Sequence, residues 1–598
     1  MSAREKEAAD FVVRSHAFKL WEAAPWLACV FVWFTMPTYL PFAAQIVIMI
    51  LFTLSYDIVV GYAGIVILGH SAFFGVGAYT AGLIAVSGWK EPISGLLCAG
   101  GAAAIIGLAA GSIILRTRGL TLLMLGLALT LLFGELANRF AGITGGHDGL
   151  QGIEISPVFG RFEFDVFGRV AFVYCATTLF LAWLFVRALV NSPFGRSLVG
   201  IRLNPVRMEA IGAPVVKRKL IAFTLSAALA GIAGGLSAQV SQFVSLSVFG
   251  LDLAGAVLIM LVVGGRGRLY GAFVWRGLLH DRPGCVGQGR SGLLAFLDRP
   301  DPDRSCSVRA RRPRRSHRQV DLVLRSRSID GFGNPIVWQD RMRDGPMTST
   351  IALRTGGLTK RFNETTVVSG VDFEMKVGSR QALIGPNGAG KSTFINLLTG
   401  NLRPTQGEVW MNDVEVTTFS AHRRVRSGLA RTFQINSLFR ELSVIEHVQL
   451  AVAERMGLGQ KMIGGRAAKR ASAETAYAIL ESLKLETSAL EPIARLSYGR
   501  QRLVEIAIAL ALQPSVLLLD EPAAGVPPAD SHAVFELIER LPSDVSALFI
   551  EHDMKLVARF AQRISVLVAG RIIVEGSPRE IAESREVREI YLGNRQHV

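Results

Sequence analysis

The sequence predicts an α-helical polytopic membrane domain followed by an α/β domain of the P-loop class. Residues 26–265 are mostly apolar and contain long hydrophobic runs, whereas residues 347–598 have the composition of a soluble protein. A glycine-rich phosphate-binding motif stands near the start of this second part. Because 598 residues suffice for more than one domain, we divide the chain into an N-terminal segment, a membrane domain, an intervening segment and a P-loop domain, at residues 1–24, 25–274, 275–346 and 347–598.

The charge balance favours a membrane protein over a nucleic-acid-binding protein. Lys and Arg outnumber Asp and Glu by 64 to 48, which gives a net charge of +16. In polytopic membrane proteins such an excess collects in cytoplasmic loops. We therefore expect membrane lipid, and no nucleic acid, among the partners. The 5 cysteines show no metal or redox spacing, and we expect no disulfide framework.

Several apolar segments are candidates for membrane-spanning helices, because a bilayer core is crossed by about 20 apolar residues. They lie near 25–41, 43–61, 66–87, 93–115, 119–138, 168–190, 219–241 and 250–265, and the first and last are short. No small-x-small cleavage site follows the first segment. We therefore expect an uncleaved first helix rather than a signal peptide.

The basic residues agree with one topology, in which the N-terminus is cytoplasmic. With alternating helices, "RTR" (116–118), the basic loop 191–219 and the arginines of 266–268 all fall inside. The long loop 139–167 falls outside and is nearly neutral. Since Lys and Arg collect on the cytoplasmic side, this agreement supports the topology and puts the P-loop domain in the cytoplasm.

Two stretches of the membrane domain stand out. "GYAGIVILGHSAFFGVGAYTAGL" (61–83) is rich in glycine at membrane depth, which permits close helix packing or a broken helix beside a pathway. Both explanations stay open for its glycines, and His70 within it is either a buried, packed imidazole or part of a pathway. The polar, basic loop 192–220 is either an ordinary cytoplasmic loop or a docking surface for the P-loop domain.

The stretch "GPNGAGKST" (385–393) matches the P-loop pattern in full. It follows the strand-like run "RQALI" and precedes the helix-like run "FINLLTG", which is the context that the motif requires. Its glycines let backbone N–H groups wrap the phosphates, Lys391 reaches the β- and γ-phosphates, and Ser392 ligates Mg²⁺. We therefore expect an ATP site made by Gly385, Pro386, Asn387, Gly388, Ala389, Gly390, Lys391, Ser392 and Thr393.

A pair of acidic residues ends the predicted buried strand in "SVLLLDEP" (515–522). We expect Asp520 to hold Mg²⁺, directly or through water, and Glu521 to orient the attacking water, because phosphoryl transfer depends on such positioning. A lone acidic pair is more often a solvated strand end. Here it follows a complete P-loop in the same domain, which favours the catalytic interpretation.

The membrane domain resembles the permease subunit of branched-chain amino-acid ABC importers. The resemblance runs from about residue 40 to residue 274. It is carried by the glycine-rich stretch together with "LRTRGL" (115–120), "TGGHDGL" (144–150) and "SPFGR…EAIG…KLIAFTLSAALAGIAGGL" (192–236). These motifs are specific in combination and weak singly.

The second part resembles the ATP-binding subunit of the same importers over residues 351–594. "LSYGRQR" (496–502) is similar to the ABC signature L-S-G-G-Q, with Tyr498 and Arg500 as departures from it. The family tolerates tyrosine at the first of these positions. The resemblance implies that Ser497, Gly499 and Gln501 contact nucleotide from the start of a helix.

The same resemblance implies roles for three further residues. Gln434 in "RTFQ" fits the Q-loop, which senses Mg²⁺ and the permease, and His552 in "FIEHDM" fits the catalytic switch histidine at the γ-phosphate. Phe362 in "LTKRF" fits the aromatic that stacks on adenine. "AAGVPPAD" (523–530) occupies the D-loop position but lacks the usual aspartate, which puts communication between two ATP sites in question.

The resemblance implies a fused permease and ATPase of an ABC importer for branched-chain or related hydrophobic amino acids, in the bacterial inner membrane. It implies as partners a second permease subunit, a second ATPase subunit and an extracytoplasmic amino-acid-binding protein. One alternative is an ABC exporter, which would lack the "EAIG" loop and the glycine-rich stretch. Another is a membrane-tethered, non-transport ABC ATPase, which would usually carry two cassettes in one chain.

Residues 276–345 differ in composition from both neighbours, since they hold 15 Arg and 8 Asp but neither Lys nor Glu. A nucleic-acid patch would want aromatic residues beside the arginines, and Trp338 lies far from the run "VRARRPRRSHRQ" (308–319). A designed linker would be richer in Gly, Ser, Glu and Lys. We favour a third hypothesis, a reading-frame shift near residue 275 that replaces the last two permease helices. Such a segment is expected to be disordered.

The frameshift hypothesis predicts that limited proteolysis of the full chain cuts first within 276–345, because an unselected sequence buries too little surface to offset its ordering entropy. Mass spectrometry should then find a soluble fragment that begins near residue 347. Resequencing the gene around codon 275 should reveal the shift. Protected amides throughout this segment would contradict the hypothesis and favour a true linker.

Overall fold

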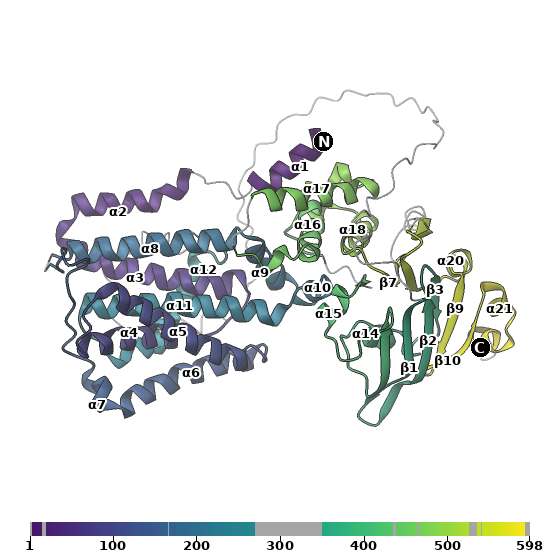
Figure 1. The fold of residues 1–598 in the computed structure, drawn as a ribbon, viewed down its shortest axis with the longest axis horizontal. Coiled ribbons are helices and arrows are strands. Elements are labelled where there is room, and N and C mark those ends of the chain that lie inside the picture. The colour runs from purple at the N-terminus through teal and green to yellow at the C-terminus, as the bar shows by residue number, and fades with distance from the viewer. Residues whose placement is uncertain are drawn as a thin grey trace, which may run out of the picture.

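The computed structural model describes residues 3–14, 20–165, 167–269, 350–433, 438–462, 466–524, 535–536, 538–539 and 541–592 (Figure 1). The predicted intervening segment 275–346, Gln434 and the D-loop positions 525–530 lie outside the described residues.

The N-terminal half consists of helices. Among the described residues, five apolar stretches are long enough to cross a membrane, and three apolar helices are shorter. The long stretches are Pro37–Tyr62, which contains α3 (Leu40–Asp57), and α5 (Pro92–Ile114), α6 (Leu120–Arg139), α8 (Arg169–Val190) and α11 (Val215–Ser241). The shorter helices are α2 (Ala24–Thr35), α4 (Ser71–Val86) and α12 (Leu251–Gly264).

These helices match the predicted segments, with differences at some of their ends. The segment predicted at 25–41 ends at Thr35, because Pro37 and Pro41 stand in the first turns of the helical pieces that follow, where proline is favoured. The segment predicted from 66 begins as a helix only at Ser71, after a non-helical stretch. The helix predicted from 219 begins four residues earlier, at Val215.

Helix α11 packs against α3, α4 and α5, and glycines make these contacts possible. A Cβ on Gly234 would lie 1.9 Å from the carbonyl oxygen of Phe74, and one on Gly77 would lie 2.1 Å from that of Gly231. Neither distance is possible for real atoms. Since lipid tails are as apolar as side chains, close backbone approach of this kind is a main source of helix association in membranes. The glycines therefore serve helix packing.

The chain is also broken beside these glycines. A π-helix at Ile58–Tyr62 ends α3, and α4 begins after the non-helical residues that precede His70. The ring of His70 is 2% exposed, and its Nε2 lies 3.1 Å from Ser55 Oγ and 3.2 Å from Ser226 Oγ. His70 is therefore a packed, hydrogen-bonded residue that joins α3, α4 and α11.

The C-terminal half contains two sheets in the described residues (Figure 1). An antiparallel sheet has the order β2-β1-β4-β5, made of β1 (Ile351–Phe362), β2 (Thr365–Lys376), β4 (Gln406–Met411) and β5 (Val414–Glu415). A second sheet has the order β10-β9-β3-β8-β7-β6, in which only β10 is antiparallel. Its strands are β3 (Arg380–Ile384), β6 (Leu429–Arg431), β7 (Val516–Asp520), β8 (Ser546–Ile550), β9 (Arg563–Val568) and β10 (Arg571–Gly576).

Strands β3, β7 and β8 are buried along their whole length, and the apolar run in "SVLLLD" predicted this for β7. The helices of this half are α14 (Lys391–Leu398), α15 (Ala421–Arg426), α16 (Val444–Arg455), α17 (Arg466–Ser482), α18 (Tyr498–Ala511), α20 (Met554–Phe560), α21 (Pro578–Glu583) and α22 (Arg585–Leu592). Helices α16, α17 and α18 pack on one another and form a helical part that faces the membrane helices (Figure 1).

The loop predicted as a docking surface folds into α9 (Pro193–Leu203), α10 (Pro205–Ala210) and the start of α11. Its side chains contact the C-terminal half. Arg218 forms a bidentate ion pair with Glu454 in which both side chains are 2% exposed, and Arg196 donates to Gln449 Oε1 at 2.7 Å. The docking prediction is therefore confirmed. The N-terminal helix α1 (Ala3–Arg14) packs beside it, against α17.

The glycine contacts predict that Gly234→Ala destabilises the membrane helices, because its added methyl group collides with the backbone of α4. We expect a loss of about 1–3 kcal/mol in the free energy of unfolding of the detergent-solubilised chain. Gly101→Ala is the matched control on α5, since a Cβ there meets nothing within 4 Å. Equal unfolding midpoints for the two variants would contradict this packing role.

Candidate active site

The topology of the parallel sheet brings the predicted catalytic residues to one edge. Strands β3, β8 and β7 are neighbours, and their carboxyl ends lie together, with Leu383 and Asp520 both opposite Ile550. The P-loop leaves β3, Glu521 follows β7, and His552 follows β8. Ligands of open α/β sheets bind outside the carboxyl ends of the strands. The sequence motifs therefore converge at the expected edge.

The P-loop, residues 385–390, connects β3 directly to α14. Gly390 has φ 100°, and a Cβ on Gly385 would lie 2.1 Å from the carbonyl oxygen of Leu567. Only glycine fits this close approach. Lys391 begins α14, and its Nζ donates to the carbonyl oxygens of Gly385 at 2.7 Å and Pro386 at 3.0 Å. The ammonium group therefore lies over the loop that is predicted to hold phosphate.

Burial lowers the pKa of Lys391, while Glu521 and Asp520 oppose this shift. The lysine therefore lies within the electrostatic field of both acidic residues. Ser392 and Thr393 follow it in the first turn of α14, where backbone N–H groups and the helix dipole attract phosphate.

Asp520 ends β7 and is 4% exposed. Its Oδ2 accepts a hydrogen bond from Arg431 at 3.1 Å, and its backbone N–H is directed to Thr432 Oγ1 at 3.3 Å. A carboxylate at the end of a buried strand, held by one arginine, keeps oxygen atoms available for a hard cation.

Glu521 adopts φ 47°, in the left-handed region that non-glycine residues rarely occupy. Such a conformation costs on the order of 1–3 kcal/mol and persists only where the surroundings hold it. The Glu521 N–H donates to the Ile550 carbonyl at 3.0 Å, and Glu521 Oε1 lies 3.0 Å from His552 Nε2. The structure thus joins the two predicted catalytic side chains.

A second carboxylate, that of Glu551, holds the residues that follow Glu521 in place. Glu551 is 6% exposed and accepts hydrogen bonds from the backbone N–H groups of Ala523, at 2.9 Å, and His552, at 3.3 Å. Burial raises its pKa, and the two backbone hydrogen bonds oppose this effect. Glu551 therefore ties the residues after Glu521 to the residues after β8.

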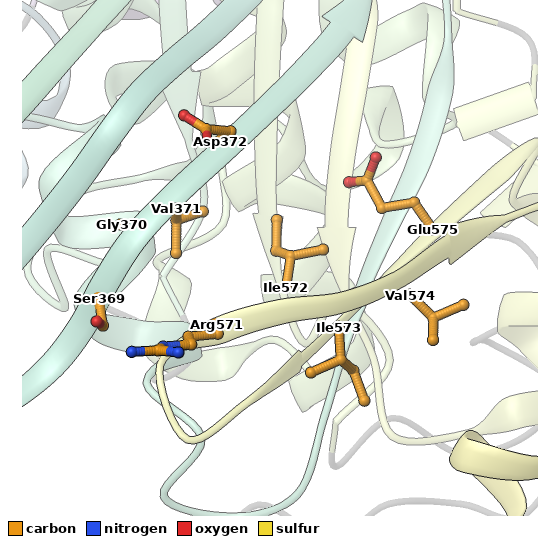
Figure 2. Close-up of a pocket in the computed structure, with 9 residues that line it drawn as sticks. All are labelled: Ser369, Gly370, Val371, Asp372, Arg571, Ile572, Ile573, Val574 and Glu575. Atoms are coloured by element: carbon orange, nitrogen blue, oxygen red, sulfur yellow. The ribbon is translucent and has the colours of Figure 1, made fainter.

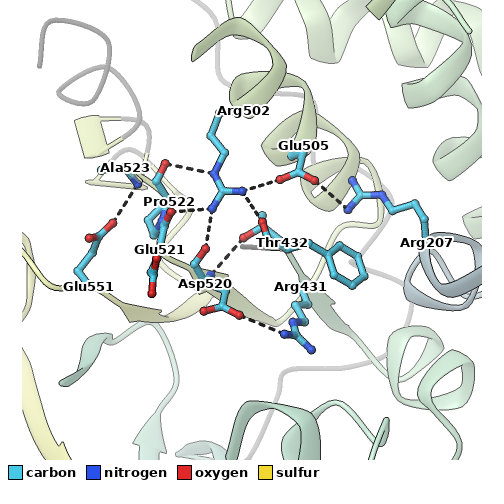
Figure 3. Close-up of polar contacts among 11 residues, drawn as sticks. Arg207, Arg431, Thr432, Arg502, Glu505, Asp520, Glu521, Pro522, Ala523 and Glu551 are labelled. Carbon is cyan, nitrogen blue, oxygen red and sulfur yellow. Dashed lines mark hydrogen bonds and ion pairs between the residues drawn. The ribbon is translucent and has the colours of Figure 1, made fainter. Parts of the chain in front are cut away.

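Sequence reasoning missed Arg502 and Glu505, which lie on α18 and are fully buried. Arg502 donates to the carbonyl oxygens of Asp520 at 2.6 Å, Glu521 at 2.7 Å and Pro522 at 3.2 Å (Figure 3). Its NH1 also donates to Glu505 Oε2 at 2.7 Å. The available signal was a charged pair three residues apart within the otherwise apolar run "RLVEIAIALAL" (502–512).

The signature residues lie on a different part of the domain from the P-loop. Ser497 precedes α18, Gly499 is buried in its first turn, and Gln501 Nε2 donates to the Leu496 carbonyl at 3.0 Å. Helix α18 packs against α16 and α17, whereas α14 packs against β2 (Figure 1).

Phe362 stands at the end of β1 and is 44% exposed, as an aromatic surface for a base requires. Gln434 lies outside the described residues, and its neighbour Phe433 accepts a hydrogen bond from Arg502 through its carbonyl oxygen.

A surface pocket lies elsewhere in this half, between the edge strands β2 and β10 (Figure 2). None of the predicted nucleotide residues lines it. Its lining residues are Ser369, Gly370, Val371, Asp372, Arg571, Ile572, Ile573, Val574 and Glu575.

Comparison with protein families assigns both halves. Residues 38–275 match the family model of the permease component of branched-chain amino acid transport systems, and residues 368–524 match that of ABC transporters.

Two curated relatives cover the second half. The high-affinity branched-chain amino acid transport ATP-binding protein BraF of Pseudomonas aeruginosa is 37% identical over 250 residues, which are 40% of this chain and 97% of the relative. The protein LivG of Escherichia coli, which carries the same description, is 38% identical over 248 residues, again 40% and 97%. An ABC transporter ATP-binding cassette solved in its ADP conformation is 31% identical, covers 41% of this chain and 100% of its own, and has a TM-score of 0.38.

The sheet edge assembles a P-loop, a buried acidic strand end and a histidine, and the membrane helices carry the permease family pattern on the same polypeptide. The chain therefore belongs to the branched-chain amino acid ABC transport family, as a permease and an ATP-binding ATPase component fused in one protein.

Proposed function

We propose that this protein hydrolyses ATP at the edge formed by β3, β7 and β8 and uses the energy to import branched-chain or related hydrophobic amino acids. The observation that carries the proposal is the contact between Glu521 and His552, at 3.0 Å, at the sheet edge to which Lys391 also belongs. Glu521 orients the attacking water, and His552 contacts the γ-phosphate. Lys391 binds the β- and γ-phosphates, and the remaining P-loop residues hold them through backbone N–H groups.

The residues at this edge fit a magnesium ion. Mg²⁺ prefers oxygen ligands and is usually held by one or two protein groups together with phosphates. Ser392 offers a hydroxyl group at the start of α14, and Asp520 offers a carboxylate at the end of β7. Gln434 is the third proposed ligand. When bound, the ion neutralises charge on the phosphate oxygens.

Phe362 is proposed to stack on the adenine. Ser497, Gly499 and Gln501 are proposed to complete the ATP site of another cassette, because they lie at the start of α18 and not beside the P-loop of their own domain. A working transporter then needs a second ATPase subunit or a second copy of this chain. It also needs a second permease subunit and an extracytoplasmic amino-acid-binding protein.

The proposed domain limits are 25–274 for the permease and 347–598 for the ATPase. Matches of the family models to residues 38–275 and 368–524 support them. The permease match ends at residue 275, beside the proposed frame shift. We place the protein in the bacterial inner membrane, with the ATPase in the cytoplasm, where the basic docking loop meets it.

The catalytic proposal predicts that Glu521→Gln keeps ATP binding and lowers the hydrolysis rate about 10²-fold or more, because the amide no longer positions the water. Lys391→Ala should instead weaken nucleotide binding itself. Both are measured on the purified full chain by phosphate release and by nucleotide titration. Glu408→Gln, at an exposed site on β4, is the control. A Glu521→Gln variant that hydrolyses ATP at the parental rate would disprove this role.

The import proposal predicts that inside-facing ATP drives leucine uptake into sealed vesicles only when the amino-acid-binding protein is present on the outer side. The physical reason is that cargo selection resides largely in that protein. Radiolabelled leucine accumulation is the measurement. ATP-driven leucine efflux that does not need the binding protein would support an exporter instead.

A further inference from the structure

Arg207 is a residue of the docking loop whose side chain is buried against the ATPase. It lies on α10 and is 1% exposed. Its NH1 lies 3.6 Å from Glu505 Oε1, and its guanidinium carbon lies 5.3 Å from the centroid of the Phe433 ring. Figure 3 shows the side chain entering from α10 toward Glu505. A permease side chain thus touches both the helix after the signature and the residue before Gln434.

The guanidinium of Arg207 is poorly satisfied for a buried charge. Among the described residues, its Nε, NH1 and NH2 make no hydrogen bond. Burial lowers its pKa, Glu505 opposes this effect, and Arg502 adds to it. A buried charge without hydrogen bonds is costly and is retained only beside an opposite charge. The opposite charge beside Arg207 is Glu505, whose Oε1 lies 3.6 Å from NH1.

Glu505 links this arginine to the catalytic strand. Its side chain is fully buried, and its two oxygens face different guanidinium groups, Oε1 toward Arg207 and Oε2 toward Arg502 at 2.7 Å. Arg502 in turn donates to the backbone carbonyls of Asp520, Glu521 and Pro522. One carboxylate is therefore shared between the permease and the turn that carries Glu521.

We propose that Arg207, Glu505 and Arg502 form a buried charge relay through which movement of the docking helix α10 positions Glu521 and so sets the rate of ATP hydrolysis. Glu521 is the sensitive end, because its strained backbone depends on the bonds that hold it. Arg207 holds Glu505 through Oε1, and this fixes the carboxylate whose Oε2 orients Arg502. When α10 moves away, Glu505 is less constrained, and Arg502 loses the orientation that directs its hydrogen bonds to the backbone carbonyls of the Glu521 turn. All three are positioning residues, and the link to rate rests on the proposed catalytic role of Glu521.

The test uses Arg207→Met in the purified full chain, since methionine keeps the apolar volume and removes the charge. Hydrogen–deuterium exchange of peptides covering 516–524 is the primary measurement, because it reports the Glu521 turn without requiring hydrolysis. We expect exchange there to rise about three- to tenfold and kcat for ATP to fall by a similar factor, with KM nearly unchanged. Glu505→Gln removes the charge of the ATPase residue in the relay, and it should give the same rise in exchange and the same fall in kcat.

Glu441→Gln is the matched control, because Arg202–Glu441 is also an ion pair between α9 and the ATPase but has a Glu441 side chain that is 66% exposed. It should change neither measurement. The Arg207→Met, Glu505→Gln double variant should be no worse than the more impaired single variant, as expected for residues of one network.

The relay is overturned if Arg207→Met speeds exchange at α10 alone and leaves 516–524 as protected as in the parent chain. Effects of the two single variants that add fully in the double variant would also overturn it. Failure of the catalytic proposal gives a different result, because Glu521→Gln would then hydrolyse ATP at the rate of the parent chain. In that case the exchange measurement still decides whether the relay positions the turn.

Discussion

A charged side chain that leaves water must find an opposite charge or hydrogen bonds, and this requirement governs how the two halves of the protein meet. The docking loop brings Arg196, Arg207 and Arg218 into the interface with the ATPase. Arg218 finds Glu454 in a bidentate pair with both side chains 2% exposed. Removing one partner of such a pair leaves an uncompensated buried charge, which typically costs about 3–5 kcal/mol. The ion pairs therefore select one docking arrangement.

The two halves are held together internally by different forces. In the ATPase, burial of apolar side chains on strands such as β7 and β8 supplies the hydrophobic stabilisation. Among the membrane helices that driving force is weak, and glycines at positions such as Gly77 and Gly234 replace it by letting backbones approach closely. The docking loop lies between the membrane helices and the ATPase. One continuous cluster of buried apolar residues extends through both halves.

In the proposed active site, hydrogen bonds from neighbouring residues hold the strained backbone of Glu521. Glu521 holds a left-handed backbone conformation, and Ile550, Arg502 and Glu551 secure the residues around it. Arg502 comes from α18, which belongs to the helical part that also receives α10. The turn that carries Glu521 is thus supported by the same helix that meets the permease, so the docking contacts and the proposed catalytic turn share one helix.

The sequence by itself determined the class of each half and most residues of the proposed active site. Hydrophobic runs located the membrane helices, and the P-loop, "LLLDEP" and "FIEHDM" located Lys391, Asp520, Glu521 and His552, because these motifs depend on local spacing at strand ends. Tertiary structure decided which polar residues are buried together. Arg207 looks like an ordinary surface charge in the sequence, and Arg502 and Glu505 differ from one only by standing in an apolar run. Their pairing depends on a contact between segments almost 300 residues apart. Pairing across such a distance is a property of packing, which no local pattern records.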